Sequence, residues 1–351
     1  MLFTPTRPWR WLRVAAVFGI LWLMYQVASE HQLRTSSEPD VCRPHGWRRF
    51  HRSSSSPKSQ PRKVYDLMMV NTEVDWLEIR MNSTWDEVDY FVIVESGRTF
   101  TGLDKPLVLK QNLAKLERYA SKMIYHEVEY PADFHALRAW DNEDFQRNSM
   151  LVQVFPKLVG TPKEANYGDV IIVSDVDEVP KPSTLAVLRA CDFPRRLTLR
   201  SRFYYYSFQY LHRGAEWSHP QATYYQGLSK TLLPNDLRIG DGGMWPFKLF
   251  EKGDFWNASW HCSSCFETMD ELLTKMKSFA HVWMNAERFR DRKRIADRIR
   301  NGKDMWDREG EVYDRIENNQ DVPSLLLLER ERFGYLLNRD GPTAGFKDYN
   351  E

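Results

Sequence analysis

The chain has 351 residues, of which 49 are Lys or Arg, 48 are Asp or Glu and 42% are hydrophobic. This composition is typical of a folded protein and excludes a fully disordered, collagen-like or polytopic membrane protein. The net charge of +1 conceals a division, because residues 1–63 carry 11 basic and 3 acidic side chains, whereas residues 64–351 carry 38 and 45. A basic N-terminal region therefore precedes a mildly acidic body.

An uncharged apolar run at residues 14–28 predicts a membrane-spanning helix. Roughly 18 residues at about 1.5 Å each would cross a thin bilayer. Arg7, Arg10 and Arg13 precede the run, so the positive-inside rule leaves the tail 1–13 in the cytoplasm and sends the body to the lumen. A cleavable signal peptide and a buried core helix are the two alternatives.

Residues 29–63 contain few apolar side chains, so we expect a flexible stem. Their charge could indicate a nucleic-acid partner, but a luminal location argues against one. Asn82 and Asn257 lie in sequons suited to N-glycosylation. An oxidising lumen would allow disulfides whose pairing the sequence leaves open, among Cys42, Cys191, Cys262 and Cys265.

Strand and helix patterns alternate from residue 64, where we expect a luminal domain that reaches residue 340 before a tail at 341–351. Strands are expected at 64–70, 90–94, 122–128 and 169–173, with helices starting near 71 and at 107–120, 140–159 and 182–190. This alternation predicts an α/β protein with a mostly parallel central sheet. Later, aromatic-rich segments at 197–211 and 223–228 indicate antiparallel strands, and residues 287–331 are predicted to be mostly helical.

The most informative local motif follows the apolar strand at 169–173, where Asp175 and Asp177 stand one residue apart. Paired carboxylates suit Mg²⁺ or Mn²⁺, which proteins usually hold together with phosphate oxygens. Such an ion would neutralise a diphosphate leaving group, which fits transfer from a nucleotide sugar. Ligands of parallel sheets bind beyond the carboxyl ends of strands, where Asn71 and Glu95 also fall. A solvated acidic turn is the alternative without function.

Two other functions remain open from the residues alone. The same motif resembles the nucleophile loop of haloacid-dehalogenase-type phosphatases, in which Asp175 would be phosphorylated and Gly240-Asp241-Gly242 would supply a later acidic motif. That loop normally follows an early strand, whereas this strand is roughly the fourth of the body. A non-catalytic glycan-binding protein is the third possibility, since the aromatic residues 204–206 could stack on sugars.

A C-x-x-C pair in the segment Trp260–Phe266 allows a zinc site, a redox pair or a plain disulfide. No second pair completes a zinc site. His261 stands beside the first cysteine and could bind a metal or a phosphate, with His281 as the second candidate. Each of them could equally be a structural histidine.

Five motifs together resemble glycosyltransferase family 17 over roughly Val64–Arg339. They are N-T-E-V-D-W-L-E-I-R from Asn71, F-V-I-V-E-S from Phe91, T-G-x-x-K-P-L from Thr101, S-D-V-D-E-V-P from Ser174 and W-H-C-S-S-C-F from Trp260. Ser259 stands where the family has Gly, and residues 195–252 match no motif of the family. The chain therefore resembles a divergent member whose acceptor is open.

The resemblance implies a GT-A-type nucleotide-diphosphate-sugar fold, a single-pass type II topology in the Golgi membrane and an inverting reaction. It also implies UDP-GlcNAc as donor, Mn²⁺ or Mg²⁺ as cofactor and a glycan acceptor such as the β-linked core mannose of N-glycans. Asp175, Asp177, His261 and His281 would hold the metal. The residues expected to bind or support the donor are Asp175, Asp177, Asn71, Glu73, Arg80, Glu95 and Arg147. The catalytic base is not identified, and its candidates are Glu178, Asp241, Glu267 and Asp270.

Overall fold

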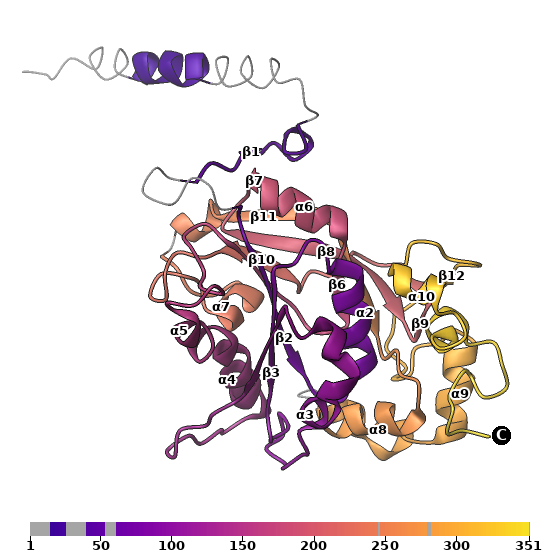
Figure 1. Cartoon of the computed structure of the whole chain (residues 1–351). Coiled ribbons are helices and arrows are strands. Elements are labelled where there is room, and N and C mark those ends of the chain that lie inside the picture. The colour runs from indigo at the N-terminus through magenta and orange to yellow at the C-terminus, as the bar shows by residue number, and fades with distance from the viewer. Residues whose placement is uncertain (1–14, 26–39, 53–60, 245, 279–281, 351) are drawn as a thin grey trace, which may run out of the picture.

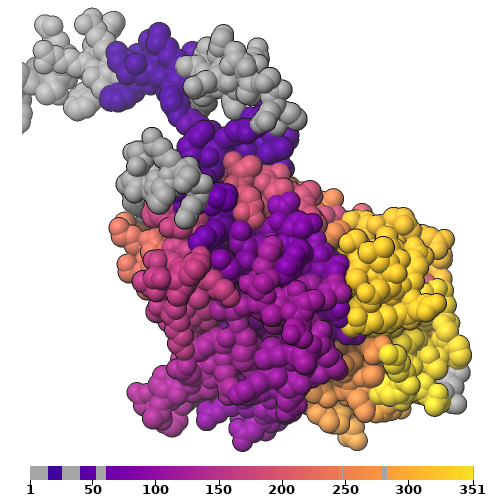
Figure 2. Space-filling view, viewed as in Figure 1, coloured from indigo at the N-terminus to yellow at the C-terminus, as the bar shows by residue number. Residues whose placement is uncertain are grey.

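The computed structural model describes residues 15–25, 40–52, 61–244, 246–278 and 282–350. Figures 1 and 2 show a compact α/β body with the helix at 15–25 lying outside it. Within the described residues, no helix is both long and apolar enough to cross a membrane. Parts of the predicted span, and the tail before it, lie outside the described residues, so the membrane segment stays a prediction.

The body is built on twelve strands in the described part of the chain: β1 (Arg48–Arg49), β2 (Val64–Val70), β3 (Tyr90–Glu95), β4 (Met123–Glu127), β5 (Val170–Val173), β6 (Glu178–Pro180), β7 (Cys191–Asp192), β8 (Arg196–Tyr205), β9 (Ser207–His212), β10 (Gln221–Tyr224), β11 (Lys252–Ser263) and β12 (Tyr313–Arg315). Ten of them form one sheet in the order β12-β9-β8-β10-β5-β2-β3-β4, with β11 beside β8 and β6 beside β11. β1 and β7 pair separately.

The direction of the strands changes in the middle of the large sheet. β5, β2, β3 and β4 are all parallel, whereas β10 is antiparallel to both β5 and β8. β9 is antiparallel to β8 and β12, and β11 is parallel to β8. The mixed α/β architecture is confirmed, but only one half of the sheet is wholly parallel. The other half is largely antiparallel, as the aromatic segments after residue 195 indicated.

Helices cover both faces of the parallel half. The α-helices of the body are α2 (Val74–Thr84), α3 (Val108–Asn112), α4 (Ala139–Val152), α5 (Phe155–Leu158), α6 (Pro182–Ala190), α7 (Pro234–Ile239), α8 (Met269–Ser278), α9 (Arg292–Arg300), α10 (Ser324–Leu328) and α11 (Gly334–Leu337). Alternate side chains of a strand point to opposite faces. Val64 and Met68 of β2 accordingly join the core that includes α2 and α6, whereas Tyr65 and Leu67 join the core of α4 and α5. The sheet thus forms the middle of three layers (Figure 1).

Two predicted helical regions differ from the observed ones. The expected helix at 140–159 is interrupted between α4 and α5. The region 287–331 is not mostly helical, because its described α-helices are only α9 and α10. Gly302 and Gly310 have positive φ values of 57° and 83° there, which end helical geometry, and Pro323 precedes α10.

All four cysteines form disulfides. Cys42 is joined to Cys191 across 149 residues, and Cys262 is joined to Cys265 across three. The first bond fastens the described segment 40–52 to the body, and this segment also contributes β1 to the pair with β7. Part of the predicted stem therefore lies against the body.

Candidate functional site

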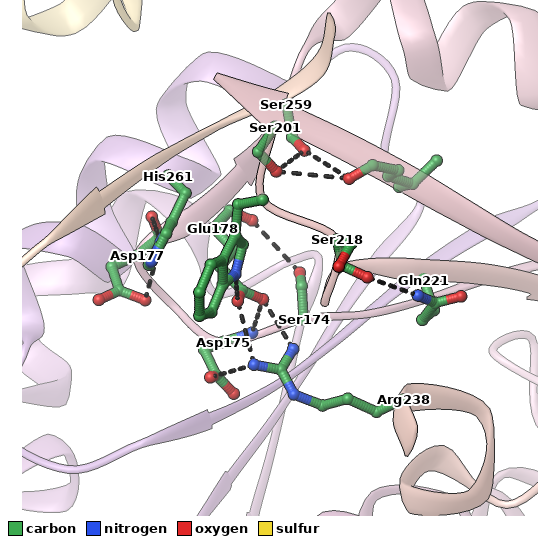
Figure 3. Close-up of polar contacts among 12 residues, drawn as sticks. Ser174, Asp175, Asp177, Glu178, Ser201, Ser218, Gln221, Arg238, Ser259 and His261 are labelled. Atoms are coloured by element: carbon green, nitrogen blue, oxygen red, sulfur yellow. Dashed lines mark hydrogen bonds and ion pairs between the residues drawn. The ribbon is translucent and has the colours of Figure 1, made fainter. Parts of the chain in front are cut away.

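The chain leaves β5 through a short acidic loop, residues 174–178, whose last residue, Glu178, is also the first of β6 (Figure 3). β5 is wholly buried between β2 and β10, so this loop is where the strand first delivers polar side chains. The backbone N–H of Asp175 donates to Oε2 of Glu178 at 2.8 Å. This bond closes the loop on itself and helps to fix the direction of the Glu178 carboxylate.

Two arginines hold the carboxylate of Asp175. Nη1 of Arg147, on α4, is 2.9 Å from Oδ1, and Nη2 of Arg238, on α7, is 2.6 Å from Oδ2. Arg238 also donates to both carboxylate oxygens of Glu178 at 2.8 and 3.0 Å. Burial favours a raised pKa for both acids, but the positive charge of Arg238, with that of Arg147 for Asp175, holds the pKa of each below its usual range.

Asp177 has different neighbours. Nζ of Lys275, on α8, lies 3.3 Å from its Oδ2 and 3.7 Å from Oε1 of Glu73. Nδ1 of His261, on β11, lies 3.8 Å from Oδ1 of Asp177. Burial alone would lower the pKa of Lys275, but the carboxylates of Asp177 and Glu73 raise it above its usual value.

A first pocket opens on the β2 side of the acidic loop. Its polar and charged wall comprises Asn71, Glu73, Arg98, Thr99, Lys105, Glu143, Gln146, Arg147, Asp175, Asp177 and Lys275. Four of these side chains are acidic and four are basic, so the formal charges of the wall cancel. A diphosphate entering this pocket would bring negative charge that the wall does not fully offset.

Three buried atoms of this wall lack a hydrogen-bond partner within the described structure: Nζ of Lys105, Oε2 of Glu143 and Nε of Arg147. Burial lowers the pKa of Lys105 and raises that of Glu143, since each charged form loses water. Buried polar atoms in native proteins are nearly always bonded. Their gathering in one pocket therefore indicates a polar ligand that carries both hydrogen-bond donors and acceptors.

A second pocket lies on the other side of the loop and shares Asp175, Asp177 and Lys275 with the first. Its wall includes stacked rings. The ring of His261 lies 5.0 Å from that of Phe203 at 15° and 4.8 Å from that of Trp217 at 23°, centroid to centroid. Flat apolar faces beside a few polar groups are typical of pockets for small organic ligands, sugars included.

Most of the donor and metal candidates from the sequence meet at this site. The residues that line one pocket or both are Asn71, Glu73, Arg147, Asp175, Asp177, Glu178 and His261. Glu178 is fully buried, and besides Arg238 it accepts a hydrogen bond from Nε1 of Trp217 at 2.6 Å. Glu178 thus orients its neighbours, and its two oxygens are already engaged.

Arg80 and Glu95 lie behind the site. Arg80 is fully buried, pairs with Asp66 and donates from Nη1 to the backbone oxygens of Asp175 at 2.6 Å and Glu178 at 3.0 Å. Glu95 accepts the backbone N–H groups at the start of α3, at 2.8 and 3.1 Å. Neither residue lines either pocket. Their contacts support the backbone around the site.

Three candidate bases lie outside both pockets. Asp241 has a side chain 70% exposed and 3.8 Å from Lys248. Glu267 pairs with Lys347, and Asp270 pairs with Arg292. The structure does not bring these three carboxylates to the acidic loop. His281 lies outside the described residues.

The two sequons differ in their surroundings. Asn82 lies within α2, and the hydroxyl of its sequon partner Thr84 is buried and donates to the backbone oxygen of Arg80 at 2.8 Å. Asn257 is exposed on β11, where Nζ of Lys181 donates to its Oδ1 at 2.7 Å. The exposed Asn257 is the more accessible acceptor for a glycan.

The chemistry of the acidic loop is compatible with a divalent cation. Asp175 and Asp177 supply the oxygen ligands that Mg²⁺ and Mn²⁺ prefer. Because the formal charges of the first pocket cancel, a cation bound with a diphosphate would offset charge that the wall does not. Within the described residues, no group of three or more His, Cys, Asp or Glu side chains could hold a metal by itself. Phosphate oxygens and water would complete the shell, as is usual for Mg²⁺.

Sequence reasoning missed several residues of the site. Arg238 gives no local signal, because its partners Asp175 and Glu178 lie 63 and 60 residues away. Lys275 could have been noticed, since it stands beside the buried Leu272 and Met276 on one face of α8. A charged residue among buried positions needs a charged partner.

The comparisons with known proteins agree with the motifs. A family model described as Glycosyltransferase family 17 matches residues 24–340. Two curated relatives, from Homo sapiens and Rattus norvegicus, are each named beta-1,4-mannosyl-glycoprotein 4-beta-N-acetylglucosaminyltransferase. Each is 26% identical, over 314 and 318 residues respectively, which is 80% of this chain and 56% and 55% of the relatives. The chain thus matches little more than half of their length.

One solved structure is also similar, the mannosyltransferase PcManGT from Pyrobaculum calidifontis in complex with GDP-Man and Mn²⁺. The two chains are 16% identical, and the match covers 54% of this chain and 44% of the mannosyltransferase chain. The TM-score of 0.27 is too low for this likeness to carry an argument.

Proposed function

This chain belongs to glycosyltransferase family 17, and we propose that it is a glycosyltransferase whose donor is UDP-GlcNAc and whose acceptor is a glycan such as the β-linked core mannose of N-glycans. The names of the curated relatives support this choice of sugar and acceptor. We further propose a GT-A-type fold, an inverting reaction and a type II position in the Golgi membrane through residues 14–28.

The observation that carries the donor assignment is the first pocket. It places the acidic loop beside three buried polar atoms that lack a partner in the described structure. A nucleotide diphosphate offers phosphate and ribose oxygens to Lys105 and Arg147 and a hydroxyl donor to Glu143. The same ligand would place its diphosphate beside Asp175 and Asp177, at the end of β5.

Asp175 and Asp177 would hold Mn²⁺ or Mg²⁺, which when bound offsets the charge of the departing diphosphate. Basic residues of the chain hold these two carboxylates in place. Arg238 and Arg147 keep Asp175 ionised and aimed, and Lys275 holds the carboxylate of Asp177 in position. The sugar then extends from the loop toward the second pocket, where an acceptor hydroxyl reaches its anomeric carbon.

The geometry does not favour the phosphatase alternative. Asp241, the proposed later acidic motif, is exposed and lines neither pocket. Family membership and the exposed position of Asp241 therefore both favour glycosyl transfer.

The test is isothermal titration of the purified full chain with UDP in the presence of Mn²⁺. We expect the wild type to bind and Asp177→Asn to bind at least about tenfold more weakly, since an amide is a poor ligand for a hard cation. Asp177 is the better choice because Asp175→Asn would remove a carboxylate that two buried arginines share.

The matched control is Asp241→Asn, the same chemical change at an exposed carboxylate outside both pockets, which should bind UDP like the wild type. Wild-type affinity in Asp177→Asn would refute the site assignment. A wild type that binds no UDP, with or without Mn²⁺, would refute the proposed donor.

A further inference from the structure

The second pocket contains carboxylates that the donor assignment does not use. Its five acidic residues are Asp175, Asp177, Glu178, Glu216 and Glu311. The first three belong to the acidic loop and are bonded to Arg238, Arg147 or Lys275. Glu216 and Glu311 remain, and they come from segments distant in sequence from the loop.

Glu311 is held in one orientation by several donors. Nε2 of His212, on β9, lies 3.1 Å from its Oε2, and the hydroxyl of Tyr313 lies 3.3 Å from the same oxygen. Nη2 of Arg308 is 3.8 Å from Oε2 as well. Because these contacts all use Oε2, the other oxygen, Oε1, has no hydrogen bond within the described structure.

The tautomer of His212 follows from its second nitrogen. The backbone N–H of Gly214 donates to Nδ1 at 3.2 Å, so Nδ1 carries no proton and Nε2 must carry one. His212 therefore donates to Glu311 and cannot itself take a proton at Nδ1 without losing the Gly214 contact. It is a positioning residue for the carboxylate.

A row of rings joins Glu311 to the acidic loop. The ring of His212 lies 5.1 Å from that of Phe203, which lies 5.0 Å from that of His261, and His261 is 3.8 Å from Asp177. These rings form an aromatic floor, with Asp177 at one end and Glu311 at the other. Glu216 differs, because its Oε2 accepts from the N–H of Asn257, in the exposed half of β11, at 2.9 Å, whereas Glu311 is in contact with His212 of the floor.

We propose that Glu311 is the general base of the transfer reaction and that the second pocket binds the acceptor sugar on the aromatic floor. The proposal rests on the proposed function. Inverting transfer needs a base across the reacting carbon from the leaving group. The diphosphate is assigned to the acidic loop, so the far end of the floor is where that base belongs.

The step balances without a further reactant. The acceptor hydroxyl gives its proton to Oε1 of Glu311 while its oxygen forms a bond to the anomeric carbon of the donor. The bond from that carbon to the diphosphate oxygen breaks, and its electron pair leaves with the diphosphate. His212 and Arg308 keep the carboxylate aimed while this proton is transferred.

The test compares kcat and KM of the full chain with UDP-GlcNAc and an N-glycan that carries the core β-mannose. We expect Glu311→Gln to lower kcat by roughly 100-fold or more and to leave UDP affinity and the KM for UDP-GlcNAc within about threefold of wild type. Glu311→Ala should regain activity when formate is added, because a small carboxylate can replace the missing base.

Asp314→Asn is the matched control. Asp314 lies three residues away, pairs with the exposed Arg213 and lines neither pocket, so its kcat should be unchanged. Thermal melting of each variant separates loss of chemistry from loss of folding. A folded Glu311→Gln protein with near-wild-type kcat would overturn the proposal, as would a kcat loss confined to Glu216→Gln. A wild type that binds UDP but transfers no sugar would overturn the proposed function itself.

Discussion

Lys105 stands in the first pocket with a buried ammonium group that has no hydrogen-bond partner in the described structure. Its charge is offset only at a distance, by Glu95 and Glu73, and burial lowers its pKa. A residue in this state costs folding free energy unless a ligand completes it. Its role in donor binding can therefore be tested separately from chemistry.

We expect Lys105→Met to weaken UDP binding by roughly 10-fold, about 1.4 kcal/mol, because a charge-assisted hydrogen bond to a phosphate or ribose oxygen is lost. The free energy of unfolding should stay the same or rise. Lys110→Met is the control, since Lys110 forms an exposed pair with Glu127 outside the pocket. Unchanged UDP affinity in Lys105→Met, measured by titration, would contradict this assignment.

At the scale of elements, Arg238 ties α7 to the loop between β5 and β6. Asp175 and Glu178 have folded-state pKa values below the usual carboxyl values near 4. Their interaction with Arg238 therefore stabilises the fold above about pH 4, and this stability is lost as the pH falls toward the folded-state values. The joint between α7 and the sheet should accordingly be sensitive to acid.

Arg238→Gln should lower the free energy of unfolding at pH 6 more than at pH 3, which urea denaturation at both values would measure. The reason is that carboxyls of the unfolded chain are largely protonated at pH 3, so a lowered folded-state pKa contributes less stability there than at pH 6. Arg213→Gln removes an arginine from an exposed pair with Asp314, and solvent screening should make its effect small at both values. Equal losses at the two pH values in Arg238→Gln would show that the arginine acts through packing instead.

The elements that a single sequence predicts well are those with local causes. The apolar strand at 169–173 and the acids after it were predictable because a continuous apolar run and the polar residues that end it are visible in neighbouring positions. Lys275 and Asp177 are 98 residues apart, and no local rule joins them. The antiparallel half carries the second pocket, and its residues 195–252 matched no motif, so Phe203, Trp217 and His212 were missed as site residues.

At the scale of the whole molecule, the two disulfides close loops of very different length. Cys42 and Cys191 are separated by 149 positions in the sequence, whereas Cys262 and Cys265 are separated by three. In the chain-entropy account, a longer loop restricts the unfolded chain more. The first bond should therefore contribute more to stability.

The Cys42→Ser, Cys191→Ser double variant should lose about 2–5 kcal/mol of unfolding free energy, measured by urea denaturation of the full chain. The Cys262→Ser, Cys265→Ser variant is the comparison and should lose less through chain entropy, although its place beside His261 could also affect activity. A larger loss of stability in the second variant would contradict the loop-length argument.

The change of strand direction between β5 and β10 has a consequence for how such a molecule can diversify. The loop at the end of β5 lines both pockets. The parallel half supplies most of the remaining wall of the first pocket, whereas β8, β9, β11 and the segments near them supply most of the second. Exchange of side chains on the antiparallel half would reshape one recognition surface and leave the other's scaffold untouched. The proposed acceptor site could therefore change while the proposed donor site, on the other half of the same sheet, is kept.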